Sequence, residues 1–173
     1  MSGKDPCRCP RTPQWRNPVH FLATGFGSGL LPKMPGTFGT LAAVPCYLLV
    51  RPESVVVFGL LILAMFAVGV VVCGRTSRDL QAHDHPSIVW DEFVGFFVTM
   101  LFAPPGLWPV VLGFVLFRIF DIIKPWPIRW FDRRVHGGFG IMLDDVIAGL
   151  FAAAVLGLIM GMVTDEPLRF GGG

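Results

Sequence analysis

Two long runs of apolar residues constrain the fold of this chain more than any other feature. Val55 to Cys73 and Val146 to Val163 contain no charged side chain, and each has about the twenty residues that a helix needs to cross a bilayer. Three shorter apolar stretches, Leu41 to Val50, Phe93 to Ala103 and Leu107 to Phe117, cross only if flanking residues extend them. The sequence therefore predicts an all-α fold: a compact helical integral membrane protein with about four to five apolar helices.

The composition agrees with this class of protein. Hydrophobic residues make up 53% of the chain and charged residues 15%, compared with about 45–50% and about 25% in soluble domains. No shift in composition divides the 173 residues, so we expect one domain, residues 17–165. Residues 1–16 and 166–173 are predicted to be flexible terminal segments.

The charge and the cysteine pattern exclude several classes of function. The formal net charge is only +2, and no basic run alternates with aromatic residues as in single-strand binders, so we exclude nucleic acid as a partner. The 4 cysteines lack the spacing of a zinc site. The N-terminal segment contains no apolar core followed by a small-residue cleavage site, so we expect no cleaved signal peptide.

The distribution of basic residues predicts the side on which the polar segments lie. If all five apolar stretches cross, the N-terminal segment, residues 74–92 and residues 118–145 share one side. Of the 14 Lys and Arg residues, only Arg51 and Arg169 then lie opposite. Because short cytoplasmic loops are rich in Lys and Arg, we expect the first side to be cytoplasmic and to carry one polar site.

Two pairs of adjacent acids, Asp91-Glu92 and Asp144-Asp145, each directly precede an apolar run. In the first turn of a helix, an acid is stabilised by about 0.3–1 kcal/mol through the helix dipole. Capping commonly explains one acid at such a place, whereas two adjacent pairs exceed that need. Hard cations such as Mg²⁺ bind one or two carboxylates together with phosphate oxygens. We therefore favour a cation site over capping alone.

Three further charged residues, Arg118, Asp121 and Lys124, recur at intervals of three and are predicted to line one side of a helix. Simple salt bridges are the alternative interpretation. The apolar surroundings make that alternative weaker, because exposed ion pairs do not need such a setting. We expect Arg118 and Lys124 to hold phosphate oxygens, with Asp121 adding to the cation site.

A glycine-rich stretch from Gly25 to Thr37 could wrap backbone N–H groups around an anion. It has neither the spacing of a dinucleotide fingerprint nor the ending of a nucleotide P-loop. A glycine motif for helix packing is an equally good interpretation, and the residues alone leave the two open.

For two other polar segments, a structural role is favoured over a binding site. His83-Asp84-His85 is more typical of a surface turn than of a transition-metal site. The segment from Lys124 to Arg134 interleaves aromatic and basic residues, which is typical of a membrane interface.

Six motifs resemble those of the phosphatidylglycerophosphatase A family. They are Leu22 to Gly29 (LATGFGSG), Pro35 to Thr40 (PGTFGT), His83 to His85 (HDH), Ile88 to Glu92 (IVWDE), Phe117 to Pro127 (FRIFDIIKPWP) and Asp132 to Asp145 (DRRVHGGFGIMLDD). The resemblance covers about residues 17 to 163. It implies a multi-pass enzyme of the bacterial inner membrane with a cytoplasmic active site. That enzyme uses Mg²⁺ to hydrolyse phosphatidylglycerophosphate to phosphatidylglycerol and inorganic phosphate.

The resemblance also implies roles for particular residues. The expected catalytic residues are Asp91, Glu92, Asp121, Asp144 and Asp145. The expected metal ligands are those five residues and Asp84. The expected substrate-binding residues are Thr24, Gly25, Gly27, Ser28, Gly36, Thr37, Arg118 and Lys124.

Other functions leave signatures that this sequence lacks. It has neither the cysteine nor the Asp-x-Asp signature of other phosphatases, nor the Asp-Gly-x-x-Ala-Arg motif of phosphatidyltransferases. A small cation transporter is the alternative from another class, although transport sites lie near the membrane midplane. The number of Mg²⁺ ions, the oligomeric state, and the choice between water and an aspartate as nucleophile are left open.

Overall fold

The computed structural model describes residues 12–82, 85–126 and 128–163, and this part of the chain contains helices and no strands. The all-α prediction is thereby confirmed for the described residues. In chain order the elements are α1 (Pro18–Ala23), the 3₁₀ helix η1 (Ser28–Leu30), α2 (Pro35–Val50), α3 (Val55–Leu80), α4 (Trp90–Thr99), α5 (Leu107–Ile123), α6 (Ile128–Arg134) and α7 (Gly137–Val163).

Four of the five apolar stretches lie within a helix, whereas Phe93 to Ala103 continues past the end of α4 at Thr99. Among the described residues, only α3 and α7 are long and apolar enough to cross a membrane. In the most hydrophobic window of each helix, 22% of α3 and 28% of α7 is buried inside the protein. Ten-residue α4 is about 15 Å long, roughly half the hydrocarbon thickness. The stretch was predicted to cross only if flanking residues extend it, and α4, with nearly all of its residues buried, forms the centre of the core.

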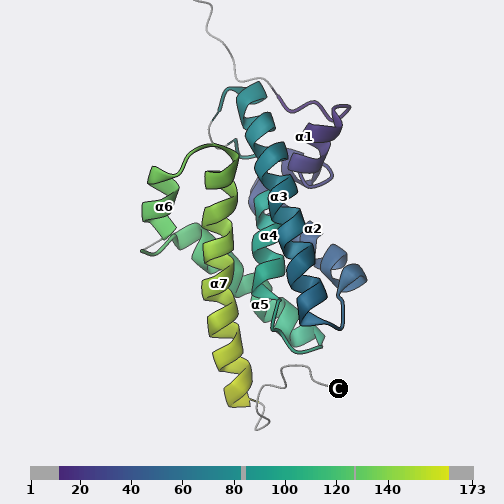
Figure 1. Cartoon of the computed structure of the whole chain (residues 1–173), viewed down its shortest axis with the longest axis vertical. Helices are drawn as coiled ribbons and strands as arrows, with labels where there is room; N and C mark the ends of the chain where they lie inside the picture. The colour runs from purple at the N-terminus through teal and green to yellow at the C-terminus, as the bar shows by residue number, and fades with distance from the viewer. Residues whose placement is uncertain (1–11, 83–84, 127, 164–173) are drawn as a thin grey trace, which may run out of the picture.

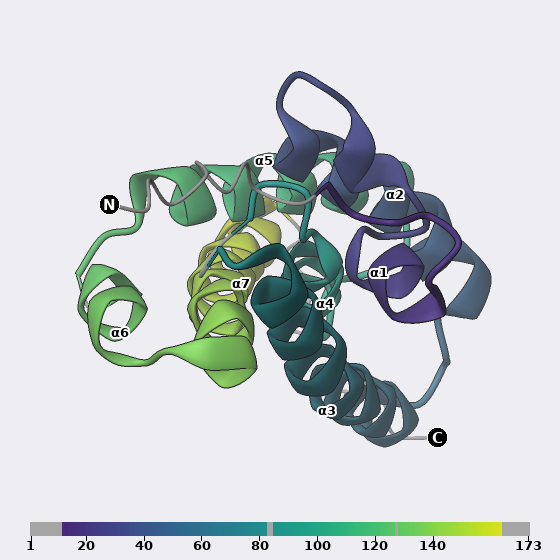
Figure 2. The ribbon, with the colours of Figure 1, turned by 90° about the horizontal axis from the view of Figure 1, so that it is seen from above.

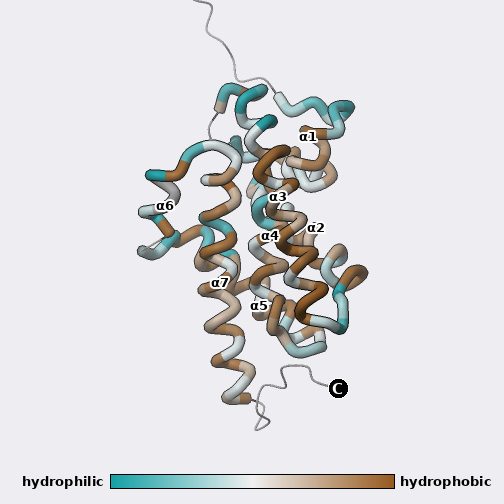
Figure 3. Tube along the Cα trace, viewed as in Figure 1, coloured by the Kyte–Doolittle hydropathy of each residue, from teal (hydrophilic) through white to brown (hydrophobic). Residues whose placement is uncertain are grey.

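The connections between helices gather at two opposite ends of the bundle (Figure 1). At one end the α2–α3 and α4–α5 connections lie together, and Nη2 of Arg51 donates to the carbonyl oxygen of Ala103 at 3.5 Å. The C-terminal end of α3 and the N-terminal end of α7 lie at the other end, which also carries α1 and α6. Figure 3 shows hydrophilic residues concentrated there. The polar segments that are predicted to share one side thus lie at the same end of the bundle.

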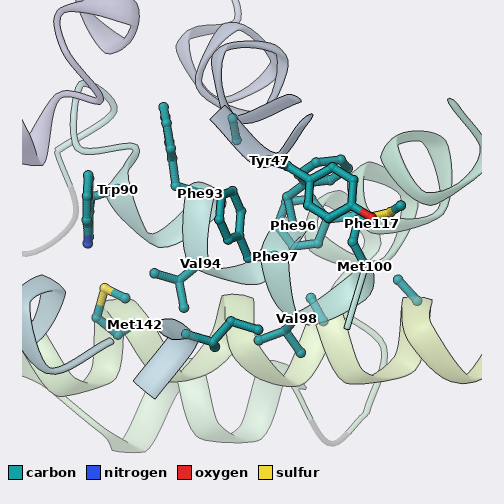
Figure 4. Packing of buried hydrophobic residues seen from close by; sticks show 14 of the residues in the cluster. Tyr47, Trp90, Phe93, Val94, Phe96, Phe97, Val98, Met100, Phe117 and Met142 are labelled. Carbon is teal, nitrogen blue, oxygen red and sulfur yellow. The ribbon is translucent and has the colours of Figure 1, made fainter. Parts of the chain in front are cut away.

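Figure 4 shows side chains of α4, among them Phe96 and Phe97, in one buried cluster with Tyr47 of α2, Phe117 of α5 and Met142 of α7. Tyr47 of α2 contacts Phe96 and Phe97 of α4 edge to face, each pair of ring centroids lying 5.9 Å apart. Nε1 of Trp90 donates to the carbonyl oxygen of Met65 at 3.1 Å, which ties the start of α4 to α3. Buried aromatic rings contribute a large part of core stability, so the first turn of α4 is held rigidly.

A close approach of two backbones joins α3 to α7. Gly74 of α3 faces Gly138 of α7, and a Cβ built on either glycine would contact the backbone of the other helix. At Gly138 the added atom would overlap the carbonyl oxygen of Val70 and lie 2.8 Å from the nitrogen of Gly74. Since backbone atoms cannot rotate away, only glycine allows this separation of the helices.

We expect Gly138→Ala to lower the free energy of unfolding by about 1–3 kcal/mol, because overpacking forces the two helices apart. Chemical unfolding of the purified protein in detergent measures the change. Gly157→Ala is the matched control in the same helix, because a Cβ there meets no atom within 4 Å. That control should be neutral or more stable, by up to about 1 kcal/mol from helix propensity. Equal losses in the two variants would contradict the proposed close approach.

Candidate functional site

A cavity of about 310 Å³ opens at the polar end of the bundle, between α2, α4, α5 and α7. Its apolar wall includes Met34, Ile88, Ile122 and Ile141. Nine of the residues predicted for the site line it together: Gly36, Thr37, Asp91, Glu92, Arg118, Asp121, Lys124, Asp144 and Asp145. Tertiary structure therefore joins three charged segments that lie far apart in the chain. We call this cavity the acidic pocket.

The first turn of α4 contributes two of the acids. Asp91 is 8% exposed, and its Oδ1 accepts a hydrogen bond from the backbone nitrogen of Glu92 at 3.1 Å. Glu92 points towards α5, where its Oε1 lies 3.5 Å from Nη1 of Arg118. The expected position of this acid pair in a first helical turn is confirmed.

The second pair of acids lies deeper in its helix than the sequence suggests. Because α7 begins at Gly137, Asp144 and Asp145 are about two turns inside it, and no acid occupies the first turn. The prediction of a first-turn position is wrong for this pair, since the helix starts before the apolar run. The dipole effect fades within the first turn, so capping does not explain these buried acids.

Arg118 lies on α5 and is held from three directions. Its Nη1 lies 2.7 Å from Oδ2 of Asp121 and 3.4 Å from Oγ1 of Thr40, in addition to the contact with Glu92. The Arg118 side chain is 14% exposed. Two acids and a hydroxyl thus fix the guanidinium at the pocket wall, where it can donate to an oxyanion.

Thr40 also contributes to the site, although it is not among the site residues predicted from sequence. It is fully buried on α2, and its hydroxyl donates to the carbonyl oxygen of Gly36 at 3.0 Å. Its only sequence signal is its position at the end of the Pro35 to Thr40 motif.

Lys124 lies just beyond α5 rather than on the same helical line as Arg118. Its backbone is left-handed, with φ of 42°, and it caps the helix. From there its Nζ donates to Oδ2 of Asp144 at 2.5 Å. The expected three-residue line is therefore interrupted after Asp121, because α5 ends at Ile123.

The glycines of α2 allow the Glu92 carboxylate to approach that helix. A Cβ on Gly36 would overlap Oε1 of Glu92, and one on Gly39 would lie 2.6 Å from Oε2. The Pro35 to Thr40 motif therefore serves the site mainly by leaving room for an acid from another helix.

The remaining glycine-rich residues do not reach the acidic pocket. Thr24, Gly25, Gly27 and Ser28 are absent from its wall. The hydroxyl of Thr24 donates to the carbonyl oxygen of Phe21, and that of Ser28 to the carbonyl oxygen of Gly25. Gly25 packs against Phe93 and Val89 behind α4. This arrangement matches the helix-packing interpretation of the motif. Of the substrate-binding residues predicted between Thr24 and Thr37, only Gly36 and Thr37 line the pocket.

The HDH motif is described only at His85, because His83 and Asp84 lie outside the described residues. Nδ1 of His85 accepts from the backbone nitrogen of Ser87 at 3.2 Å, as expected for a turn. The role of Asp84 as a metal ligand therefore stays a prediction.

The acidic pocket has an excess of negative charge, which repels a phosphate ester unless a bound cation offsets it. Five carboxylates face two cationic side chains on its wall. Asp145 is the most deeply placed of the five at 4% exposed, and the charges of Asp121, Asp91, Asp144 and Glu92 all act on it. Oδ2 of Asp145 is buried and has no hydrogen-bond partner in the described part of the chain. Such a group is costly to bury unless a cation or a donor joins it.

The carboxylate oxygens of the pocket suit a hard cation that is bound by the protein and by the substrate together. Within the described residues, no three His, Cys, Asp or Glu side chains are grouped closely enough to hold a metal ion by themselves. Mg²⁺ does not need such a cage, because it binds through one or two carboxylates and keeps water and phosphate oxygens as its other ligands. The carboxylate oxygens and the orphaned Oδ2 of Asp145 fit that requirement.

Comparison with known proteins gives a consistent result. A family model described as phosphatidylglycerophosphatase A matches residues 21–160. The Escherichia coli K12 protein named Phosphatidylglycerophosphatase A is 51% identical over 141 residues, which cover 81% of this chain and 82% of the relative. The Haemophilus influenzae protein of the same name is 46% identical over 142 residues, covering 81% and 87%. No solved structure matches the chain. The matched span includes the whole wall of the acidic pocket.

Proposed function

The chain belongs to the phosphatidylglycerophosphatase A family and is a phosphatase, and we propose that it hydrolyses phosphatidylglycerophosphate to phosphatidylglycerol and inorganic phosphate. The observation that carries this proposal is the acidic pocket itself. Its carboxylates, Arg118 and Lys124 all lie inside the matched span and converge on one cavity. The transporter alternative gains no support, because the relatives are named as phosphatases and the carboxylates line one cavity together with Arg118 and Lys124.

The bond that breaks joins the terminal phosphorus to an oxygen of the headgroup glycerol. Water supplies the new oxygen on phosphorus, and its proton goes to the departing glycerol oxygen. The reaction is very slow without catalysis, so the site must offset the charge of the phosphoryl oxygens and align the nucleophile. Arg118 is placed to donate to those oxygens, since two acids and Thr40 hold its guanidinium at the pocket wall.

We propose Mg²⁺ as the cofactor, with ligands drawn from the pocket carboxylates Asp91, Glu92, Asp121, Asp144 and Asp145, one or two of which would bind each ion directly. When bound, the ion supplies positive charge for the phosphate oxygens and lowers the pKa of a coordinated water. The support is the donor chemistry of the pocket and the buried, unpartnered Oδ2 of Asp145. Lys124, which donates to Asp144, adds a second positive charge near the substrate.

Two nucleophiles are available in this pocket: a water molecule oriented by a carboxylate, or an aspartate oxygen that forms a transient acyl phosphate. Trapping with hydroxylamine distinguishes them, because it converts an acyl phosphate into a stable hydroxamate at one residue.

We also propose that the protein is a multi-pass protein of the bacterial inner membrane, with α3 and α7 crossing and the acidic pocket on the cytoplasmic side. The length and hydropathy of these helices support crossing. Residues 74–92 and 118–145 contain seven Lys and Arg residues, whereas residues 51–54 and 104–106 contain only Arg51, and this excess supports the orientation.

Removal of the metal is expected to abolish activity. Phosphate release from phosphatidylglycerophosphate should be measured with the purified protein in detergent, first with Mg²⁺ and then with excess chelator. We expect the rate to fall to background and to return when Mg²⁺ is added in excess, because the negative pocket cannot hold a phosphate dianion alone. Release that persists in excess chelator would rule out the metal but not the phosphatase activity.

A further inference from the structure

A second cavity, of about 500 Å³, lies next to the acidic pocket and differs from it in charge. Its described wall consists of Ile123, Lys124, Pro125, Trp126, Arg129, Trp130 and Arg134. Three of these seven residues are cationic, and none is acidic. We call this cavity the basic pocket. The positive charge of the basic pocket is suited to binding an anion, whereas the acidic pocket has an excess of carboxylates.

Lys124 lines both cavities and therefore joins them. Its left-handed backbone turns the chain out of α5 and towards α6. Figure 2 shows α6 beside α7 and the end of α5, away from the other helices. An extended ligand can thus reach from the acidic pocket past Lys124 into the basic pocket.

Both arginines of the basic pocket are placed by contacts within it. Nη2 of Arg129 donates to the carbonyl oxygen of Ile123 at 3.4 Å, and the guanidinium of Arg134 lies over the Trp130 ring, 4.8 Å from its centroid. An arginine stacked on an aromatic ring keeps its N–H groups at its edge, where they can meet phosphate oxygens. Trp126, at 82% exposed, supplies an open apolar wall.

We propose that the basic pocket binds the phosphodiester of the lipid whose terminal phosphate occupies the acidic pocket. This inference rests on the proposed function, because that substrate carries two phosphates joined by a glycerol. The monoester has the higher charge and needs the cation site, whereas the diester has one negative charge and suits arginines. Lys124, between the pockets, lies where the linking glycerol passes. The basic pocket is therefore a specificity site that selects lipids with two phosphates over lipids with one.

Binding of two probes to the metal-loaded protein tests this inference separately from catalysis. Short-chain phosphatidylglycerol carries the diester without the monoester, and inorganic phosphate represents the monoester alone. Calorimetry in detergent with the double variant Arg129→Gln/Arg134→Gln should show phosphatidylglycerol binding weakened by about tenfold or more, because the phosphodiester loses two charge-assisted hydrogen-bond donors. Binding of inorganic phosphate should be unchanged. In turnover, KM for phosphatidylglycerophosphate should rise with little change in kcat.

Two control variants sharpen the result. Arg75→Gln/Arg78→Gln removes the same charge from the exposed end of α3, outside both pockets, and should leave both probes unaffected. Arg129→Lys/Arg134→Lys keeps the charge and should restore part of the affinity for phosphatidylglycerol. Unchanged phosphatidylglycerol binding in the glutamine variant would overturn the inference. An equal loss in the α3 control would also overturn it, since that result indicates general attraction of anionic lipid. A wild-type protein that binds both probes but does not hydrolyse phosphatidylglycerophosphate would overturn the proposed function instead.

Discussion

Asp145→Asn is expected to reduce kcat for phosphate release by about a thousandfold, which corresponds to roughly 4 kcal/mol of transition-state stabilisation. The substitution keeps the size of the side chain and removes the most deeply buried carboxylate of the acidic pocket. An amide is a much weaker ligand for Mg²⁺ than a carboxylate and cannot act as a nucleophile or base. The measurement is the rate of phosphate release at saturating lipid and Mg²⁺.

The same variant should be at least as stable as the wild type when Mg²⁺ is absent. The Asp145 carboxylate is buried beside four other acids and has an oxygen without a hydrogen-bond partner in the described part of the chain. Removing a buried charge of this kind relieves repulsion and desolvation. Thermal unfolding in chelator should therefore begin at the same or a higher temperature, while added Mg²⁺ should stabilise the wild type more than the variant.

Glu53→Gln is the matched control, since Glu53 is an exposed acid in the α2–α3 connection, outside the pocket. It should retain normal kcat and normal stabilisation by Mg²⁺. If Asp145→Asn has wild-type kcat, Asp145 is neither a ligand nor a catalytic group. If it loses activity only because it unfolds at the assay temperature, its role is structural.

Arg118→Gln is expected to lower kcat/KM by about a hundredfold or more, a typical cost for removing one donor to a developing oxyanion. Arg118 is the cation that contacts acids of both α4 and α5, and its guanidinium faces the acidic pocket. Without it, the terminal phosphate loses a positive partner while the carboxylates remain. Arg118→Lys should give an intermediate rate, because it keeps the charge and loses the planar fork.

A purely structural salt bridge makes a different prediction for Arg118. In that case Arg118→Gln would lower the unfolding temperature, yet the fraction that stays folded would turn over lipid at the normal rate. Measuring kcat/KM well below the unfolding temperature, together with the folded fraction, separates the two roles. A normal kcat/KM for the folded protein would remove Arg118 from the site.

The charged residues of the site could be predicted from sequence, because charged side chains directly beside apolar runs are rare. The pairs at Asp91 and Asp144, together with Arg118 and Lys124, were identified in this way, and the structure brings them to one pocket. The distribution of apolar residues likewise located the helices, since backbone groups in an apolar run need internal hydrogen bonds. Family motifs added the substrate class, which no spacing of charges specifies by itself.

What the sequence did not reveal depends on the rotation and depth of one helix against another. The start of α7 at Gly137, the place of Thr40 behind Arg118, and the joining of two pockets at Lys124 all arise from packing between helices. The residues alone left open whether the glycines before Leu31 form an anion loop or pack against a helix, and in the structure Gly25 and Gly29 pack against Val89 at the start of α4.

The helical class, the concentration of charged segments and the residue types of the site could be predicted from sequence, because hydropathy and charge are local properties. Tertiary structure alone decided which acids meet, which cation each one contacts, and that a negative and a positive cavity lie side by side. Those contacts follow from the close packing of side chains between helices, which allows only a few arrangements of neighbouring surfaces and cannot be read from any one helix.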